Sequence, residues 1–185
     1  HSTQGPCENA TKFNKAWGLL RLVKYHSAEL AFSLIEGEQP GTYLIAGSGS
    51  SQWNLQRDLF CTTVDSEGTI LWSQLYGDVS DEKDGRICRA WDGGYMLVGT
   101  TFSYGAQLND VILYKLDSLG QEEWHRLYGG IEIETGRTIT PSRDSAYLIL
   151  GETSSFATQG RIDIHLIKVS QVGDTLFYQT FGFEG

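Results

Sequence analysis

Hydrophobic residues occur in short runs along the chain, separated by turns that contain glycine. The clearest runs begin at a tyrosine and end at a glycine, YLIAG, YMLVG and YLILG at 43–47, 95–99 and 147–151. A second apolar run follows each of these and begins at an aspartate, Asp58, Asp110 or Asp163. The second runs are apolar on both faces, which is typical of strands packed between neighbouring sheets. The pattern therefore predicts many short β-strands.

These runs belong to a repeat of 52 or 53 residues that occurs three times. Seven positions keep the same order in each copy: Tyr43, Tyr95 and Tyr147; Gly47, Gly99 and Gly151; Asp58, Asp110 and Asp163; Gly68, Gly120 and Gly173; Trp72, Trp124 and Phe177; and the pairs Tyr76-Gly77, Tyr128-Gly129 and Phe181-Gly182. Self-similarity at this period predicts a repeat architecture.

Each unit predicts four strands, the first of which has a weak pattern, around Leu34–Ile35, Arg86–Ala90 and Arg137–Thr140. The fourth strand is TILWSQLY, QEEWHRLY or DTLFYQTF, in which alternate side chains share one face. Four short antiparallel strands about every 50 residues are typical of a β-propeller blade. The predicted fold is all-β, a propeller segment of about three four-stranded antiparallel blades plus one extra N-terminal outer strand.

The repeat also predicts the organisation of the chain. Its parts are an N-terminal extension at 1–11, an outer strand of a neighbouring blade at 12–18, blade 1 at 19–77, blade 2 at 78–129, blade 3 at 130–182 and the start of a further unit at 183–185. The segment after 18 is longer than its counterparts, and a short helix is the alternative to its first strand. Because 12–18 lacks its own blade, we expect further blades or a partner chain to complete a larger propeller.

The sequence DGGYMLVGTTFSYGAQLNDVILYKLDSLGQEEWHRLYGG at 92–130 resembles the repeats of secreted β-propeller proteins of the Bacteroidetes type. The Asp-x-x-Gly-x-x-x-Trp spacing is also similar to the tryptophan-docking motif of quinoprotein-like propellers. The third repeat departs from the pattern, since Ser170 stands where Asp65 and Asp117 stand in the others. The resemblance implies a propeller that is exported to the cell surface or beyond, in some families by type IX secretion.

Charge and length narrow the classes of function. The 185 residues carry a formal net charge of −9 and their basic residues are not clustered, so we expect no nucleic-acid partner. No apolar run approaches the roughly 20 residues of a membrane span, so we expect no membrane insertion. No signal peptide is visible, and one is presumed to have been removed.

Few residues have a spacing that suggests a disulfide, a metal site or a catalytic site. Cys61 and Cys88 either form a disulfide that leaves Cys7 over, or are small buried thiols, which we favour. The four histidines, His1, His26, His125 and His165, have no metal-ligand spacing. The segment DVSDEKDG at 78–85 resembles a calcium loop, but its part SDEKDG fails the ligand pattern, so the segment predicts a solvated acidic loop. We therefore expect no metal, no cofactor and no catalytic residue.

The repeated residues have structural and functional interpretations. Asp58, Asp110 and Asp163 are predicted to hold turns, with carboxylates around a ligand channel as the alternative and Lys115 and Lys168 as their expected partners. Gly68, Gly120 and Gly173 are predicted to form the turn before the fourth strand, whose aromatic residue, Trp72, Trp124 or Phe177, docks against the next blade. Short motifs suggest O-glycosylation at Ser118, Ser145 and Thr175.

The sequence thus favours a non-catalytic exported propeller that acts as a surface-attachment, binding or assembly module. Its expected partners are proteins, cell-surface glycans or further blades. The alternative is a propeller enzyme, glycan-active or quinoprotein-like, whose active site lies on blades missing from this chain.

Overall fold

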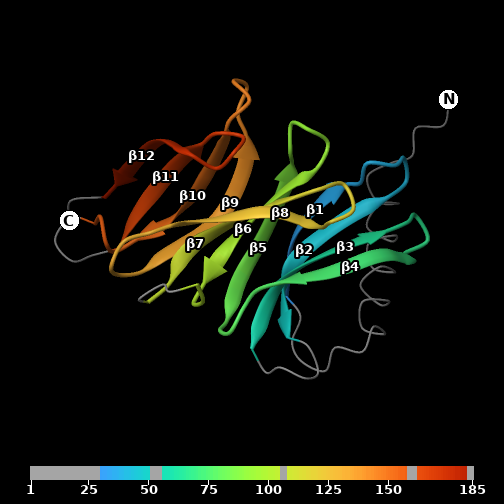
Figure 1. Ribbon diagram of the computed structural model, residues 1–185, viewed down its shortest axis with the longest axis horizontal. Helices are drawn as coiled ribbons and strands as arrows, with labels where there is room; N and C mark the ends of the chain where they lie inside the picture. The colour runs from blue at the N-terminus through green and yellow to red at the C-terminus, as the bar shows by residue number, and fades with distance from the viewer. Residues whose placement is uncertain (1–29, 51–55, 105–107, 158–161, 183–185) are drawn as a thin grey trace.

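The structure, a computed structural model, describes residues 30–50, 56–104, 108–157 and 162–182. These ranges contain β-strands and no helix (Figure 1). The strands are β1 (Leu30–Glu36), β2 (Tyr43–Ser50), β3 (Arg57–Val64), β4 (Ile70–Tyr76), β5 (Glu82–Arg89), β6 (Tyr95–Thr101), β7 (Asp110–Leu116), β8 (Glu122–Tyr128), β9 (Glu134–Pro141), β10 (Tyr147–Thr153), β11 (Asp163–Val169) and β12 (Thr175–Phe181). The segment after residue 18 is therefore a strand from residue 30 onward, and the strand predicted at 12–18 lies outside the described residues.

The strands form three four-stranded antiparallel sheets, in the orders β1-β2-β3-β4, β5-β6-β7-β8 and β9-β10-β11-β12. The sheets stand side by side, with β5 to β8 between the other two (Figure 1). The all-β class and the three predicted antiparallel blades are confirmed. We call these sheets blades 1, 2 and 3.

The first strand of each blade lies against the blade before it. β5 contacts β1, β2 and β3, and β9 contacts β5, β6 and β7. A Cβ atom placed on Gly85 of β5 would lie 2.4 Å from the carbonyl oxygen of Gly47, and one on Gly136 of β9 would lie 2.6 Å from that of Gly99. Glycine is therefore required wherever the backbones of two blades meet so closely.

Apolar side chains fill the two spaces between blades. The core between blades 1 and 2 includes Leu44, Leu59, Leu97, Ile112 and Tyr114. The core between blades 2 and 3 includes Met96, Val98, Leu113, Ile149 and Ile167. β6 and β7, the central strands of blade 2, are buried on both faces, which explains their unbroken apolar runs.

The turn between the third and fourth strands has the same construction in each blade. In blade 2, the Oδ1 of Asp117 accepts hydrogen bonds from the backbone N–H groups of Leu119 and Gln121, both at 2.8 Å. Gly120 follows with φ of 78°, a left-handed conformation that favours glycine. In blade 1, Asp65 accepts the equivalent hydrogen bonds from two backbone N–H groups. In blade 3, the hydroxyl of Ser170 accepts them in place of a carboxylate.

This turn receives aromatic side chains from the preceding blade. Trp72 lies against Gly120, where an added Cβ would be 2.6 Å from its ring, and Trp124 lies against Gly173 at 3.0 Å. The hydroxyl of Tyr76 donates a hydrogen bond of 2.7 Å to the carbonyl of Gly120. The hydroxyl of Tyr128 donates an equivalent bond of 2.8 Å to Gly173. Both tryptophans are partly rather than fully buried, and the tyrosine hydroxyls add a directional hydrogen bond to each junction.

Substitution of Tyr128 measures the strength of this bond. Tyr128→Phe removes the donor and leaves the buried carbonyl of Gly173 unpaired, which costs about 1–3 kcal/mol of unfolding free energy. The chain provides its own control at the equivalent position of blade 3, where Phe181 is exposed. Phe181→Tyr is expected to change stability by less than about 0.5 kcal/mol. Urea denaturation of both variants tests this, and equal effects would show that the hydroxyl bond does not hold the junction.

Candidate functional site

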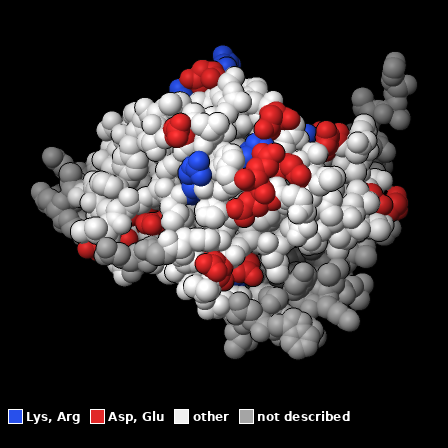
Figure 2. Space-filling model, in the orientation of Figure 1, with Lys and Arg blue, Asp and Glu red and all other residues white. Residues whose placement is uncertain are grey.

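An open hollow of ≈ 220 Å³ lies at one end of blade 2, between its first and last turns. It is lined by Glu38, Asp92, Gly93, Gly94, Lys115, Asp117, Ser118 and Glu123. Acidic side chains gather in the middle of the face shown in Figure 2, where β8 crosses the view. The lining carries four carboxylates and one lysine, so its net charge is negative.

Lys115 is the central residue of the hollow, and its side chain is only 4% exposed. Its Nζ lies 3.0 Å from the Oδ2 of Asp92 and 2.8 Å from the Oε2 of Glu123, and it also donates to the carbonyl of Leu116. Burial opposes the charge of Lys115, but the bonds to Glu123 and Asp92 outweigh it and raise the pKa of the lysine. The ammonium group is fully engaged within the blade.

The same ion pair occurs in blade 3, where Lys168 bonds to Asp144. Thr63 takes the place of the lysine in blade 1. The expected pairing of Lys115 with Asp110, and of Lys168 with Asp163, is therefore replaced by pairing with Asp92 and Asp144. The reason is alternation along the strand, because residues 110 and 115 of β7 point to opposite faces.

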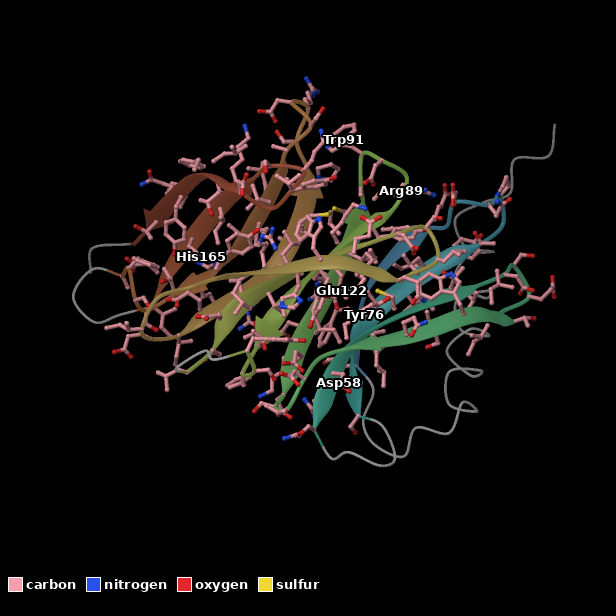
Figure 3. All side chains as sticks on the ribbon, in the orientation of Figure 1. Asp58, Tyr76, Arg89, Trp91, Glu122 and His165 are labelled. Atoms are coloured by element: carbon pink, nitrogen blue, oxygen red, sulfur yellow. The ribbon has the colours of Figure 1, made fainter. Side chains whose placement is uncertain are left out.

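The repeated aspartates lie at the opposite ends of their strands, and Asp58 and Asp110 lie there at the junctions with the next blade. The carboxylates of Asp58, Asp110 and Asp163 each lie next to the glycine that ends the fourth strand, Gly77, Gly129 or Gly182. Asp58 is labelled at one end of β3 in Figure 3. In the described part of the structure, the Oδ1 of Asp110 is buried and has no hydrogen-bond partner. The turns before the fourth strands are held by Asp65, Asp117 and Ser170.

Glu82 and Glu134 lie at the same junctions, at the starts of β5 and β9, and both are fully buried. The Oε1 of Glu82 accepts a hydrogen bond of 2.7 Å from the hydroxyl of Thr101, and the Oε1 of Glu134 accepts one of 2.7 Å from Thr153. The interpretation of 80–85 as a solvated acidic loop is wrong for Glu82, because β5 begins at this residue. A sequence signal was available, since the two glutamates are 52 residues apart.

The aspartate of one blade faces the glutamate of the next. A Cβ on Gly77 would lie 2.3 Å from the Oδ1 of Asp58 and 2.4 Å from the Oε2 of Glu82. The two oxygens are thus less than about 5 Å apart, within the range where like charges raise each other's pKa. Gly129 stands in the same relation to Asp110 and Glu134, at 1.9 Å and 3.1 Å.

The carboxyl groups of these junctions have altered acidity. Burial, and then the charge of Asp81, raise the pKa of Asp58; burial is also the main cause that raises the pKa of Glu82. Burial and then the charge of Glu134 raise the pKa of Asp110. Burial would raise the pKa of Glu134 as well, but the hydrogen bonds that it accepts outweigh burial and lower it.

A buried histidine lies between blades 2 and 3 (Figure 3). The Nδ1 of His165 lies 3.0 Å from the hydroxyl of Tyr178, and its Nε2 lies 3.2 Å from the carbonyl oxygen of Thr135. Because a carbonyl can only accept, Nε2 carries the proton and Nδ1 accepts from Tyr178. Burial lowers the pKa of His165, so the ring is held neutral.

The other predicted residues are distributed over the surface and the core. Ser145 is exposed in a turn, Thr175 is exposed at the start of β12, and Ser118 lines the hollow. Cys61 and Cys88 are buried free thiols, and burial raises the pKa of Cys88 to about 12. Among the described residues, no group of three or more His, Cys, Asp and Glu side chains could hold a metal ion. The same ranges contain no helix long and apolar enough to cross a membrane.

The arrangement of these blades is that of part of a β-propeller. No family model and no curated protein matches the chain. Among solved structures, it is similar to the endo-arabinase of Bacteroides thetaiotaomicron, with a TM-score of 0.53 and 16% identity over 78% of this chain and 60% of that one. A eukaryotic initiation factor gives a TM-score of 0.46 and 10% identity over 83% of this chain and 32% of that one. The chain thus spans 60% of the length of the endo-arabinase, and that likeness supports the fold.

The neutral His165 predicts a loss of stability in acid. Its folded pKa lies below its unfolded value of about 6.5, so its contribution is complete above that pH and is lost as the pH falls through it. We expect the urea midpoint of His165→Phe to fall less than that of the wild type between about pH 7.5 and pH 5. Phe60 occupies the equivalent position of blade 1, so the substitution suits the fold. Ile112→Phe, at the equivalent buried position of blade 2, is the control and should keep the wild-type dependence of the urea midpoint on pH. The same dependence in all three proteins would contradict the prediction.

Proposed function

We propose that this chain is a non-catalytic, exported propeller segment that assembles with a further blade through the outer face of blade 3. The observation that supports this most strongly is the exposure of that face. Export to the cell surface is supported by the resemblance of the repeats to those of secreted propellers.

The outer face of blade 3 repeats a face that is buried in blade 2. On blade 2, the positions that meet blade 3 are Met96, Val98, Val111, Leu113 and Tyr128, and all are buried. Their equivalents on blade 3 are Leu148, Leu150, Ile164, Leu166 and Phe181. Three of these side chains are exposed to solvent: Leu150 is 41% exposed, Ile164 40% and Phe181 48%. The docking aromatic Phe177 is exposed as well, so the sheet presents a contiguous apolar face.

Such a face is typical of a surface that is covered in the functional assembly. Its occupant is best matched by another blade, because Gly151 repeats the glycine that receives the next first strand, and Phe177 repeats the aromatic residue that contacts the next turn. A second copy of the chain fits less well. It would have to offer the opposite face of its blade 1, where Ile45, Phe60 and Val64 are already buried.

Charged substitutions on this face test the proposal. Ile164→Glu and Phe181→Glu are expected to abolish the binding of an apolar fluorescent dye by the chain, with little loss of stability. Val172→Glu, at an equally exposed turn position, is the matched control and should bind dye like the wild type.

A direct test adds a further blade after blade 3. A second copy of residues 130–182 fused after residue 182 supplies a first strand with its glycine and a turn with its glycine. It is expected to raise the midpoint of thermal unfolding and to abolish dye binding, and the Ile164→Glu version of the fusion should lose both effects. Unchanged dye binding in the fusion would overturn the proposal.

The alternative is a propeller enzyme, glycan-active or quinoprotein-like, with its active site on blades outside this sequence. The likeness to an endo-arabinase favours the glycan-active form, although 16% identity extends to the fold alone. Assays of the whole protein on arabinans and related polysaccharides distinguish the two. Turnover at enzyme-like rates would replace the assembly function with a catalytic one.

A further inference from the structure

We infer that each blade junction of this chain binds one proton, shared between the aspartate that begins the third strand of one blade and the glutamate that begins the next blade. The two proton sites are Asp58 with Glu82 and Asp110 with Glu134. They are separate from the face of blade 3 and do not depend on the proposed function.

At both junctions two carboxyl groups lie within about 5 Å of each other, and no described Lys or Arg forms an ion pair with either. The side-chain oxygens of Asp58 and Glu82 both converge on the space beside Gly77, which no larger residue could share. In the described residues, the Oε2 of Glu82 and the Oδ1 of Asp110 are buried and lack a hydrogen-bond partner. Each of these atoms lies beside the same glycine, Gly77 or Gly129, as an oxygen of the other carboxyl group of its pair.

A single bound proton allows the two carboxyl groups of a pair to bond to each other. Two ionised carboxylates are acceptors only, so they can form no bond with each other and repel in a buried site. A proton on one of them turns it into a donor, and the pair gains a short O–H···O bond. No Lys or Arg among the described residues forms an ion pair with any of the four carboxyl groups. No set of three ligating side chains is available there for a metal ion either.

The surroundings decide which member carries the proton at the second junction. Glu134 accepts bonds from the Thr153 hydroxyl and from the backbone N–H groups of Gly130 and Ser155, at 2.7, 2.7 and 3.1 Å. These three donors favour its ionised form. Asp110 has no such donors at Oδ1, so it holds the proton and donates to Glu134.

At the first junction, the hydrogen bonds do not decide which of the two carboxyl groups carries the proton. The Oε1 of Glu82 accepts a hydrogen bond from Thr101, whereas its buried Oε2 has no hydrogen-bond partner among the described residues, so either Asp58 or Glu82 can hold the proton. The charged and titratable groups near this pair are Asp81 and Asp78 before β5, with the hydroxyls of Tyr104 and Tyr114 from blade 2. Near the second pair they are His165 and Tyr178 of blade 3. Asp78 and Asp81 add negative charge; the Nζ of Lys83 lies 3.7 Å from the Oδ2 of Asp81, whereas no described Lys or Arg forms an ion pair with the four junction carboxyl groups themselves.

The bound protons couple the junctions to pH. A carboxyl group that holds a proton in the folded state above its ordinary pKa of about 4 contributes stability that is complete below that value. The contribution is lost as the pH rises through the folded pKa, because both members of the pair then become charged. The junctions are therefore tightest in mild acid and weaken toward alkaline pH, opposite in sign to the effect of His165.

Amide substitutions test this inference in the full chain. Asp58→Asn and Asp110→Asn supply a permanent donor of the same shape, so their urea midpoints should match the wild type near pH 4 and exceed it at about pH 8. The control is Asp81→Asn, which removes a neighbouring charge but keeps both pairs and the bond from the Arg57 N–H. It should retain most of the wild-type fall in midpoint between those pH values. His165 is present in every protein and cancels in the comparison.

Infrared difference spectroscopy provides an independent readout. At about pH 5.5, where ordinary carboxyl groups are ionised, the wild type and Asp81→Asn should show the C=O band of a protonated carboxyl group. The Asp58→Asn/Asp110→Asn double variant should lack it. Absence of the band from the wild type would overturn the inference. So would a rise in the wild-type midpoint on addition of Ca²⁺, because a cation would then occupy the pairs in place of the proton.

Discussion

The backbone contact between the first strand of one blade and the second strand of the preceding blade is the constraint on which this structure depends. Gly85 and Gly136 allow it, because any side chain there would overlap the carbonyl oxygen of Gly47 or Gly99. The contact fixes how closely two blades approach and how they are rotated. With the inner strands fixed, the apolar runs of β6 and β7 meet a sheet on each side, and the outer strands can dock through Trp72 and Trp124.

The same contact brings charged groups into places where they would otherwise not be tolerated. Glu82 and Glu134 begin the inner strands, so they are carried into the junction together with the aspartate of the preceding blade. Each glutamate has a threonine hydroxyl from its own blade as a partner. The junction therefore contains an apolar core along the strands and a polar pair at one end, and the polar pair responds to pH while the core does not.

Two kinds of surface result from this plan. Where one blade meets another, every repeated aromatic and apolar side chain has a partner, and the hydroxyls of Tyr76 and Tyr128 bond to the neighbouring turn. On blade 3 the same positions carry Phe177 and Phe181, which are exposed and lack the hydroxyl. The acidic hollow around Lys115 is different, because its lysine is engaged within a single blade. The assembly surface thus follows from the repeat, whereas the hollow depends on an ion-paired lysine of blade 2 and on acidic side chains of blades 1 and 2.

Much of the fold could be predicted from the sequence, because a period of 52 or 53 residues and two-residue alternation within each strand are properties of the chain itself. They determined the class, the four strands of each blade and the turns at Gly68, Gly120 and Gly173. Tertiary structure decided the rest. The sequence assigned Glu82 to a solvated loop and paired Lys115 with Asp110, because local charge density does not reveal which blade covers a residue or to which face it points. The burial of Glu82, the exposure of Phe181 and the pairing of carboxyl groups across Gly77 and Gly129 all depend on contacts between residues of different strands or blades, and only the packing of one blade on the next creates them.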